Sequence, residues 1–206
     1  VSPGDAVWLV SSYQLAVLVA LLPCGAMGEM VGSRRVFLAG VALFTLASAA
    51  CAFSGTLPML VAARFVQGLG GGAVMALGVT NLRLSVPQRL LGTIIGVNAM
   101  TIAISSAAGP GIAGAILAVA DWHWLFAVNI PLGIVVLASG AVLAETPGVA
   151  RRLDGRAMAA SSLMFVLFFL GADQVAQSAA TGSFLIAMSV ACLVLLLRIE
   201  RRSVTP

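Results

Sequence analysis

The chain has 206 residues, of which 61% are hydrophobic and 9% are charged. About a quarter of the residues in a soluble domain are charged, so this composition excludes a soluble globular core. The net charge of +4 comes from arginines scattered in short gaps between apolar runs, a pattern that excludes a nucleic-acid-binding surface. The sequence therefore predicts a multi-pass membrane protein with the lipid bilayer as its partner.

Seven apolar runs are long enough, or nearly so, to cross the hydrocarbon core as helices, which takes about 20 residues each. We expect these helices at residues 7–27, 36–53, 57–80, 91–118, 125–143, 157–172 and 183–197. Pro110 is expected to kink the fourth helix or to end its straight part. The predicted fold class is an all-α integral membrane protein with seven transmembrane helices.

The arginines alternate along the chain. Ten of the eleven lie in the connections after the first, third, fifth and seventh apolar runs. Cytoplasmic connections carry the excess of basic residues, so we expect these connections in the cytoplasm, residue 1 outside, and the protein in the inner or plasma membrane. All three tryptophans then fall at the outer interface. An external start without Met also leads us to expect a further helix before residue 1.

The eleventh arginine lies inside an apolar run. Arg64 is about seven residues below Leu57, and a charge at the bilayer centre costs about 3 kcal/mol on insertion scales. We expect Arg64 to line a central cavity, although it could instead reach the outer interface. Gln67 shares its helix face, and the glycines at 68–72 would leave room for a neighbouring helix or a ligand.

The expected cavity is apolar with scattered polar groups. Its further polar candidates are Tyr13, Gln14, Asn98, Thr101 and Ser105. Such a cavity suits bulky lipophilic compounds, often cations, as small-molecule substrates. The alternative for each group is a hydrogen bond to a neighbouring helix. None of the seven acidic residues lies in the middle of an apolar run, so no obvious proton-carrying carboxylate is present.

Nothing in the sequence predicts an enzyme. There is no nucleophile–base pair and no phosphate-binding loop, and His123 is the single histidine. The three cysteines, Cys24, Cys51 and Cys192, lie far apart in apolar runs without metal-ligand spacing. They are interpreted as small packed hydrophobes, so no metal and no cofactor is expected.

Residues 25–35 form a glycine-rich connection with a carboxylate and paired arginines. The candidate gating residues are Gly25, Gly28, Glu29, Gly32, Arg34 and Arg35. Gly32 permits a tight turn, and an ordinary basic loop is the alternative interpretation. The stretch resembles the loop signature between helices two and three of the major facilitator superfamily. Glu29 replaces the usual aspartate, and Met30 and Ser33 stand where arginines are common.

Three further stretches resemble signatures of the same family. Residues 64–70 match R-x-x-Q-G-x-G in helix four. The fourth run resembles the export-type signature of helix five, through Gly96, Gly109, Pro110, Ala113 and Gly114. The residues that resemble the start of helix six in the fourteen-helix drug/proton antiporter branch are Trp122, Trp124, Asn129, Pro131 and Gly133. The alternative for the fourth run is generic small-residue packing.

The resemblance implies that the chain supplies helices two to eight of such an antiporter, with the remaining transporter helices absent. Residues 1–145 would form part of the amino-terminal bundle, and 146–206 a cytoplasmic linker with two extra helices between the halves. The implied function is export of lipophilic or cationic drug-like compounds, coupled to the proton gradient. Two alternatives stay open: a transport-inactive sensor or interaction protein with the same fold, and a facilitator-type importer.

Overall fold

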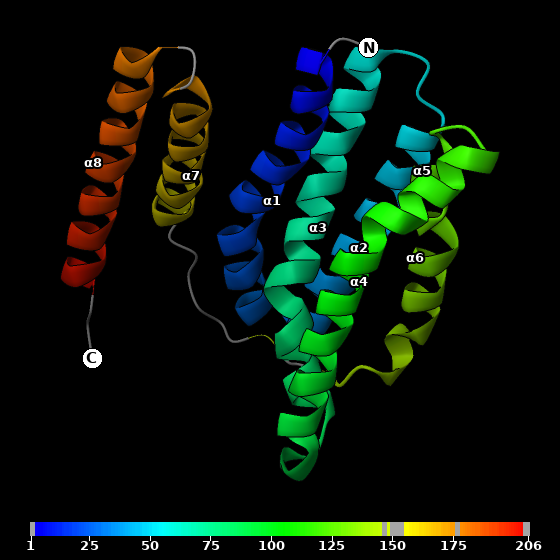
Figure 1. The fold of residues 1–206 in the computed structure, drawn as a ribbon. Helices are drawn as coiled ribbons and strands as arrows, with labels where there is room; N and C mark the ends of the chain where they lie inside the picture. The colour runs from blue at the N-terminus through cyan, green and yellow to red at the C-terminus, as the bar shows by residue number, and fades with distance from the viewer. Residues whose placement is uncertain (1–2, 146–147, 149–154, 176–177, 204–206) are drawn as a thin grey trace.

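The computed structural model describes residues 3–145, 148, 155–175 and 178–203, and this part of the chain is helical without a strand. Figure 1 shows long helices that run alternately down and up. The helices are α1 (Pro3–Val31), α2 (Ser33–Ala52), α3 (Leu57–Ser85), α4 (Leu91–Val119), α5 (Trp124–Ala127), α6 (Asn129–Ala138), α7 (Gly155–Val175) and α8 (Ala179–Ser203), with short 3-10 turns η1 (Gln88–Leu90) and η2 (Ser139–Val142).

The predicted all-α membrane fold is confirmed. Five described stretches are long and apolar enough to cross a membrane, and two shorter apolar helices follow. The five are Trp8–Val31, Ser33–Ala52, Leu57–Ser85, Gln88–Val119 and Trp124–Val142, and the shorter two are Ala160–Val175 and Ala179–Val194. Each predicted run therefore corresponds to one helix or, for 125–143, to α5, α6 and η2 in succession.

Helix α4 runs from Leu91 to Val119 with Pro110 inside it, in agreement with the predicted run 91–118. One predicted boundary was wrong. The connection expected at 25–35 shrinks to Gly32, because α1 continues to Val31 and α2 begins at Ser33. Gly32 has φ 103°, a backbone conformation that glycine adopts without steric penalty. One such residue suffices to reverse the chain, so the flanking residues remain helical.

Helix α3 lies between α1 and α2, and its glycines set the spacing. A Cβ atom at Gly72 would lie 2.7 Å from the Ala20 Cβ on α1, and one at Gly70 would lie 2.6 Å from the Phe44 nitrogen on α2. The helices thus approach backbone to backbone, as small residues permit in membranes. Neighbouring helices, rather than a ligand, occupy the space beside these two glycines.

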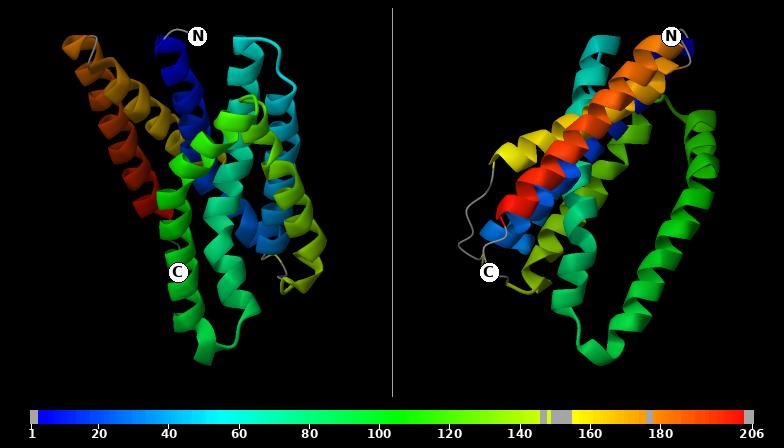
Figure 2. Two further views of the ribbon diagram at one scale, coloured as in Figure 1. Left: turned by 45° about the vertical axis from the view of Figure 1, so that its right-hand side comes forward. Right: turned by 90° about the vertical axis from the view of Figure 1, so that its left-hand side faces the viewer.

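Helices α7 and α8 pack as a pair beside α1 (Figures 1 and 2). The Ser189 hydroxyl on α8 donates to the Met164 carbonyl on α7 at 2.9 Å, and the Ser162 hydroxyl on α7 donates to the Val19 carbonyl on α1 at 3.2 Å. The linker before α7 lies mostly outside the described residues, as do the side chains of Arg151, Arg152 and Arg156.

Helix α4 stands to one side of the bundle (Figure 2). No residue of α4 is buried, and α4 has few contacts with α3 and α5. A Cβ atom at Gly96, Gly109 or Gly114 would meet no other atom within 4 Å. The small-residue face of the export-type motif is therefore unoccupied within the described part of the chain.

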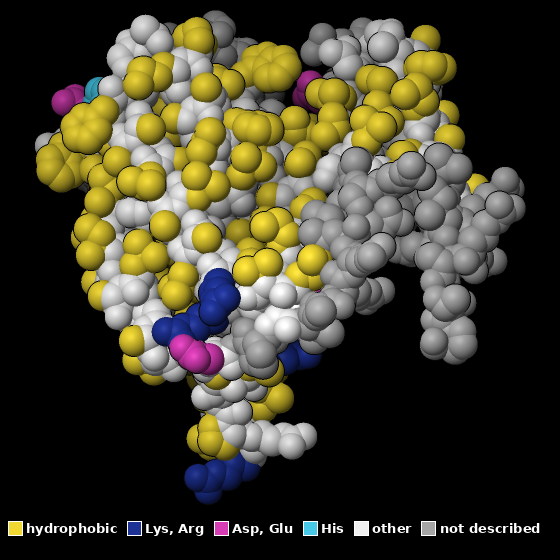
Figure 3. All heavy atoms as spheres, turned by 180° about the vertical axis from the view of Figure 1, so that it is seen from behind, with side chains coloured by type: hydrophobic (Ala, Val, Ile, Leu, Met, Phe, Trp, Pro, Cys, Tyr) yellow, Lys and Arg dark blue, Asp and Glu magenta, His cyan; other side chains and the backbone are white. Residues whose placement is uncertain are grey.

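Four arginines outside the apolar runs lie toward one end of the molecule. Arg34 and Arg35 follow the α1–α2 junction, and Arg83 and Arg89 flank the α3–α4 connection, which lies at the bottom of Figure 1. Figure 3 shows arginine side chains at the lower end and hydrophobic surface above them. The helices therefore bring these alternate connections together, as the charge pattern predicts.

Candidate functional site

Arg64 lies on α3 where α1 and α5 meet it. Its Nε donates to the Leu9 carbonyl of α1 at 3.4 Å, and its Nη1 donates to Gln67 Oε1 at 3.0 Å. The guanidinium carbon lies 4.6 Å from the Tyr13 ring centroid and 5.4 Å from that of Phe126. In the described part of the chain, no carboxylate forms an ion pair with Arg64. Dipoles and aromatic faces therefore stabilise its charge.

Gln67 connects Arg64 to α2. Its side chain is 1% exposed, and its Nε2 donates to the Ser48 hydroxyl at 2.7 Å. Ser48 in turn donates to the Phe44 carbonyl at 2.7 Å. Because the Gln67 oxygen accepts from Arg64 while its nitrogen donates to Ser48, the amide orientation is fixed. Polar networks of this kind are strong when every member is satisfied.

The structure divides the predicted cavity residues into two groups. Arg64 contacts both Tyr13 and Gln67 in the network, whereas Gln14 on α1 is exposed. Asn98, Thr101 and Ser105 are on α4, away from this network, and the Thr101 hydroxyl donates to the Val97 carbonyl of its own helix at 2.8 Å. Within the described part of the chain, the α4 residues and the Arg64 network therefore do not line a common cavity.

Sequence reasoning missed four members of the network: Leu9, Ser48, Cys51 and Phe126. The Cys51 sulfur lies 4.0 Å from Gln67 Oε1, and Cys51 is fully buried. Phe126 lies between Trp124 and Asn129 of the helix-six motif, and a search for aromatic partners of Arg64 could have found it. Leu9 contributes through its backbone, and Ser48 is one of several serines on α2, so neither carries a sequence signal.

The candidate gating residues lie at the end of α1, at Gly32 between the helices, and at the start of α2. Gly25, Gly28 and Glu29 occupy the last turns of α1, and a Cβ at Gly28 would contact Leu77 on α3. Gly25, Gly28 and Glu29 also line a cavity of about 530 Å³ between α1 and α3. Because Gly28 allows α1 to lie against α3, any movement of α1 here changes this contact.

Arg34 forms a salt bridge with Glu145, which follows η2, at 3.2 Å. Glu145 is 91% exposed, and ion pairs in this setting contribute less than about 1 kcal/mol. We therefore expect Glu145→Gln to lower the melting temperature of the purified chain by little or nothing at physiological salt. A large loss of stability would contradict a role limited to orienting Arg34.

Asn81 joins α3 to the start of α2, a contact that sequence reasoning also missed. It is 2% exposed, accepts a hydrogen bond from the Ser33 hydroxyl at 3.0 Å, and donates to the carbonyls of Ser33 at 3.2 Å and Leu77 at 3.0 Å. The bonds to Ser33 fix the α1–α2 junction against α3.

We expect Asn81→Ala to destabilise the chain by about 2 kcal/mol, because it leaves the buried Ser33 hydroxyl without this acceptor. Thermal unfolding in detergent, followed by circular dichroism, measures the effect. Asn98→Ala on α4 is the matched control and should change stability much less. Equal effects of the two substitutions would contradict the structural role of Asn81.

The residues at the start of helix six pack locally and against α2. The Trp122 ring stacks on His123 with centroids 3.7 Å apart and meets Phe126 edge-on at 6.2 Å. Asn129 begins α6, Pro131 lies in its first turn, and a Cβ at Gly133 would contact Thr45 of α2. Trp124 is 61% exposed. This packing orients Phe126 toward Arg64.

Known proteins resemble this chain in sequence. The sequence profile of the Major Facilitator Superfamily matches residues 1–202. The chain belongs to this superfamily. Within the described residues, no group of three or more His, Cys, Asp or Glu side chains is placed to hold a metal ion.

Several curated relatives are transporters. Uncharacterized transporter YebQ of Escherichia coli is 46% identical over 66% of this chain and 30% of its own length. MdtD of Salmonella typhi, a protein named for multidrug resistance, is 39% identical over 65% of this chain and 28% of its own length. The tetracenomycin C resistance and export protein of Streptomyces glaucescens is 35% identical over 69% of this chain and 26% of its own length. The chain thus spans less than a third of each relative.

Proposed function

We propose that the chain forms family helices two to eight of a longer secondary transporter that exports lipophilic or cationic drug-like compounds. The observation that carries the proposal is the likeness to two relatives named for resistance or export, together with an export-type motif on α4. Residues 1–145 would belong to the amino-terminal bundle, and 146–206 would form the linker and the two extra helices. No catalytic chemistry is part of this function.

The proposed orientation places the arginine-rich connections in the cytoplasm and residue 1 outside, in the inner or plasma membrane of the cell. Transporters of this kind bind substrate between repeats and rock between two access states. The unoccupied face of α4 is where we place the remaining helices, because small residues favour close helix contact. The coupling ion would be the proton, carried by a carboxylate outside this chain.

Arg64 would act in this mechanism as a fixed positive charge beside the proton or substrate path. The cation–π contact with Tyr13 and the bond to Gln67 hold the guanidinium in place without an acidic partner among the described residues. Such a charge favours the ionised form of a carboxylate that approaches it. Arg64→Ala is expected to lower transport by at least about tenfold at unchanged membrane level.

Everted membrane vesicles test the export function. With the full-length transporter present and respiration acidifying the lumen, ethidium should accumulate inside the vesicles, and collapse of the pH gradient by nigericin should abolish the accumulation. Vesicles carrying Arg64→Ala serve as the matched comparison. A sensor or interaction protein would show no accumulation in any condition, and an importer would move ethidium outward. Either result would contradict the proposal.

A further inference from the structure

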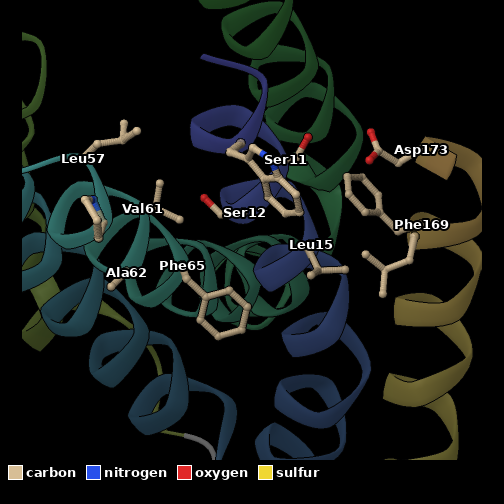
Figure 4. Close-up of a pocket in the computed structure, with 12 residues that line it drawn as sticks. Ser11, Ser12, Leu15, Leu57, Val61, Ala62, Phe65, Phe169 and Asp173 are labelled. Atoms are coloured by element: carbon tan, nitrogen blue, oxygen red, sulfur yellow. The ribbon is translucent and has the colours of Figure 1, made fainter. Parts of the chain in front are cut away.

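A second cavity lies between α1, α3 and α7, and its lining residue Ser12 donates to the same Leu9 carbonyl that accepts from Arg64. Its volume is about 520 Å³, within the range of about 300–1,000 Å³ that is typical of small-molecule sites. The lining residues are Trp8, Ser11, Ser12, Leu15, Leu57, Pro58, Val61, Ala62, Phe65, Phe169, Leu170 and Asp173. Figure 4 shows α1 in the middle of the site, with the α3 residues on one side and α7 on the other.

The cavity has a polar mouth and an apolar interior. Asp173 lies near the end of α7, and Leu57 begins α3 at the same end of the molecule. In Figure 4 the Asp173 side chain extends from α7 toward α1, and Phe169 lies one turn deeper. The lining also contains the hydroxyls of Ser11 and Ser12 and the indole N–H of Trp8. A carboxylate at the rim of an apolar cavity is suited to a ligand with one charged end.

The charge and the rings favour a cation. Asp173 is the single charged lining residue, and within the described part of the chain it forms no ion pair. An ionised carboxylate beside a membrane needs a counter-charge or water. The faces of Trp8, Phe65 and Phe169 attract cations, and their surface suits a lipophilic body.

The depth of the cavity indicates a compact ligand. From Trp8 to Leu15 the lining follows α1 for about 10 Å of helix rise. One leaflet of the hydrocarbon core is about 15 Å thick, so the acyl chains of a phospholipid would extend beyond the cavity. A drug-sized molecule fits the depth and the volume.

We propose that this cavity binds a drug-sized lipophilic cation, with its ammonium group beside Asp173 and its apolar body among Trp8, Phe65 and Phe169. The site lies at the outer end of the bundle in the proposed orientation, between α1, α3 and α7. The proposed site rests on the proposed export function only in the chemical class of the ligand. The test measures binding by the 206-residue chain and needs no transport.

The test compares two probes with the same diphenylhexatriene body. Trimethylammonium-diphenylhexatriene carries a cation, and diphenylhexatriene does not. With Trp122→Phe and Trp124→Phe in place, Trp8 is the single tryptophan, and a bound probe should quench its fluorescence. In neutral maltoside micelles we expect saturable quenching by the cationic probe, about tenfold weaker after Asp173→Asn and retained after Asp173→Glu. The neutral probe should not distinguish these variants.

Asp121→Asn is the matched control, because Asp121 is an exposed carboxylate that does not line the cavity. It should leave the affinity unchanged. The proposal would be overturned if the cationic probe bound the Asp173→Asn variant as tightly as the chain that keeps Asp173. It would also be overturned if Asp173→Asn weakened binding of the neutral probe by the same factor. Displacement of the cationic probe by added phosphatidylethanolamine would assign the cavity to an aminolipid and also overturn it. Failed transport with intact binding would contradict the exporter function alone.

Discussion

Gly70→Ala should destabilise the α2–α3 contact strongly. The new Cβ would lie 2.6 Å from the Phe44 nitrogen and 2.7 Å from the Gly40 oxygen, both backbone atoms that cannot rotate away. The helices must separate, and overpacking of this kind costs about 1–3 kcal/mol or more. We expect a lower melting temperature in detergent and less folded protein in the membrane.

Gly111→Ala on α4 is the control for this prediction. A Cβ there would meet no atom within 4 Å, and alanine favours a helix over glycine by about 1 kcal/mol. The control should therefore melt at the same temperature or slightly higher. If the two alanine variants melted alike, the backbone contact between α2 and α3 would not be as close as described.

Gln67→Leu should have the second large effect. The substitution removes the acceptor that lies 3.0 Å from Arg64 Nη1 and the donor that lies 2.7 Å from the Ser48 hydroxyl. Arg64 would keep the Leu9 carbonyl but lose its strongest partner in a largely apolar surrounding. We expect a loss of about 2–3 kcal/mol in unfolding free energy, because the group that loses its hydrogen-bond acceptor is the charged guanidinium of Arg64.

A double-mutant cycle separates this effect from ordinary repacking. Arg64→Leu removes the charge itself, so Gln67→Leu should cost less in the Arg64→Leu background than alone, by about 1–2 kcal/mol. Unfolding in detergent with increasing denaturant measures all four proteins. Strict additivity of the two substitutions would contradict the coupling between Arg64 and Gln67.

The fold could be predicted from sequence because long apolar runs and clustered arginines are strong, local signals. The helix boundaries near Gly32 could not, because they depend on whether a helix continues through residues of low helix propensity. At 25–31 the glycines and the charged Glu29 indicated a loop, yet α1 continues to Val31 and packs against α3. Tertiary packing decided this boundary, not local propensity.

The candidate site could be predicted only in part. Arg64 and Gln67 stand out because they are polar residues in an apolar run at helical spacing. Their partners Leu9 and Ser48 come from α1 and α2, and which helix faces meet is set by the glycines of α3. The cavity beside Asp173 was also missed, because it exists only where α7 packs against α1 and α3. Contacts between distant segments carry no local sequence pattern.

Reconstitution into liposomes tests most directly whether this chain is one part of a rocking transporter. Liposomes with the purified 206-residue chain alone should show no ethidium movement under an imposed pH gradient, whereas liposomes with the full-length transporter should accumulate the dye. Robust, gradient-driven transport by the 206-residue chain alone would contradict the account.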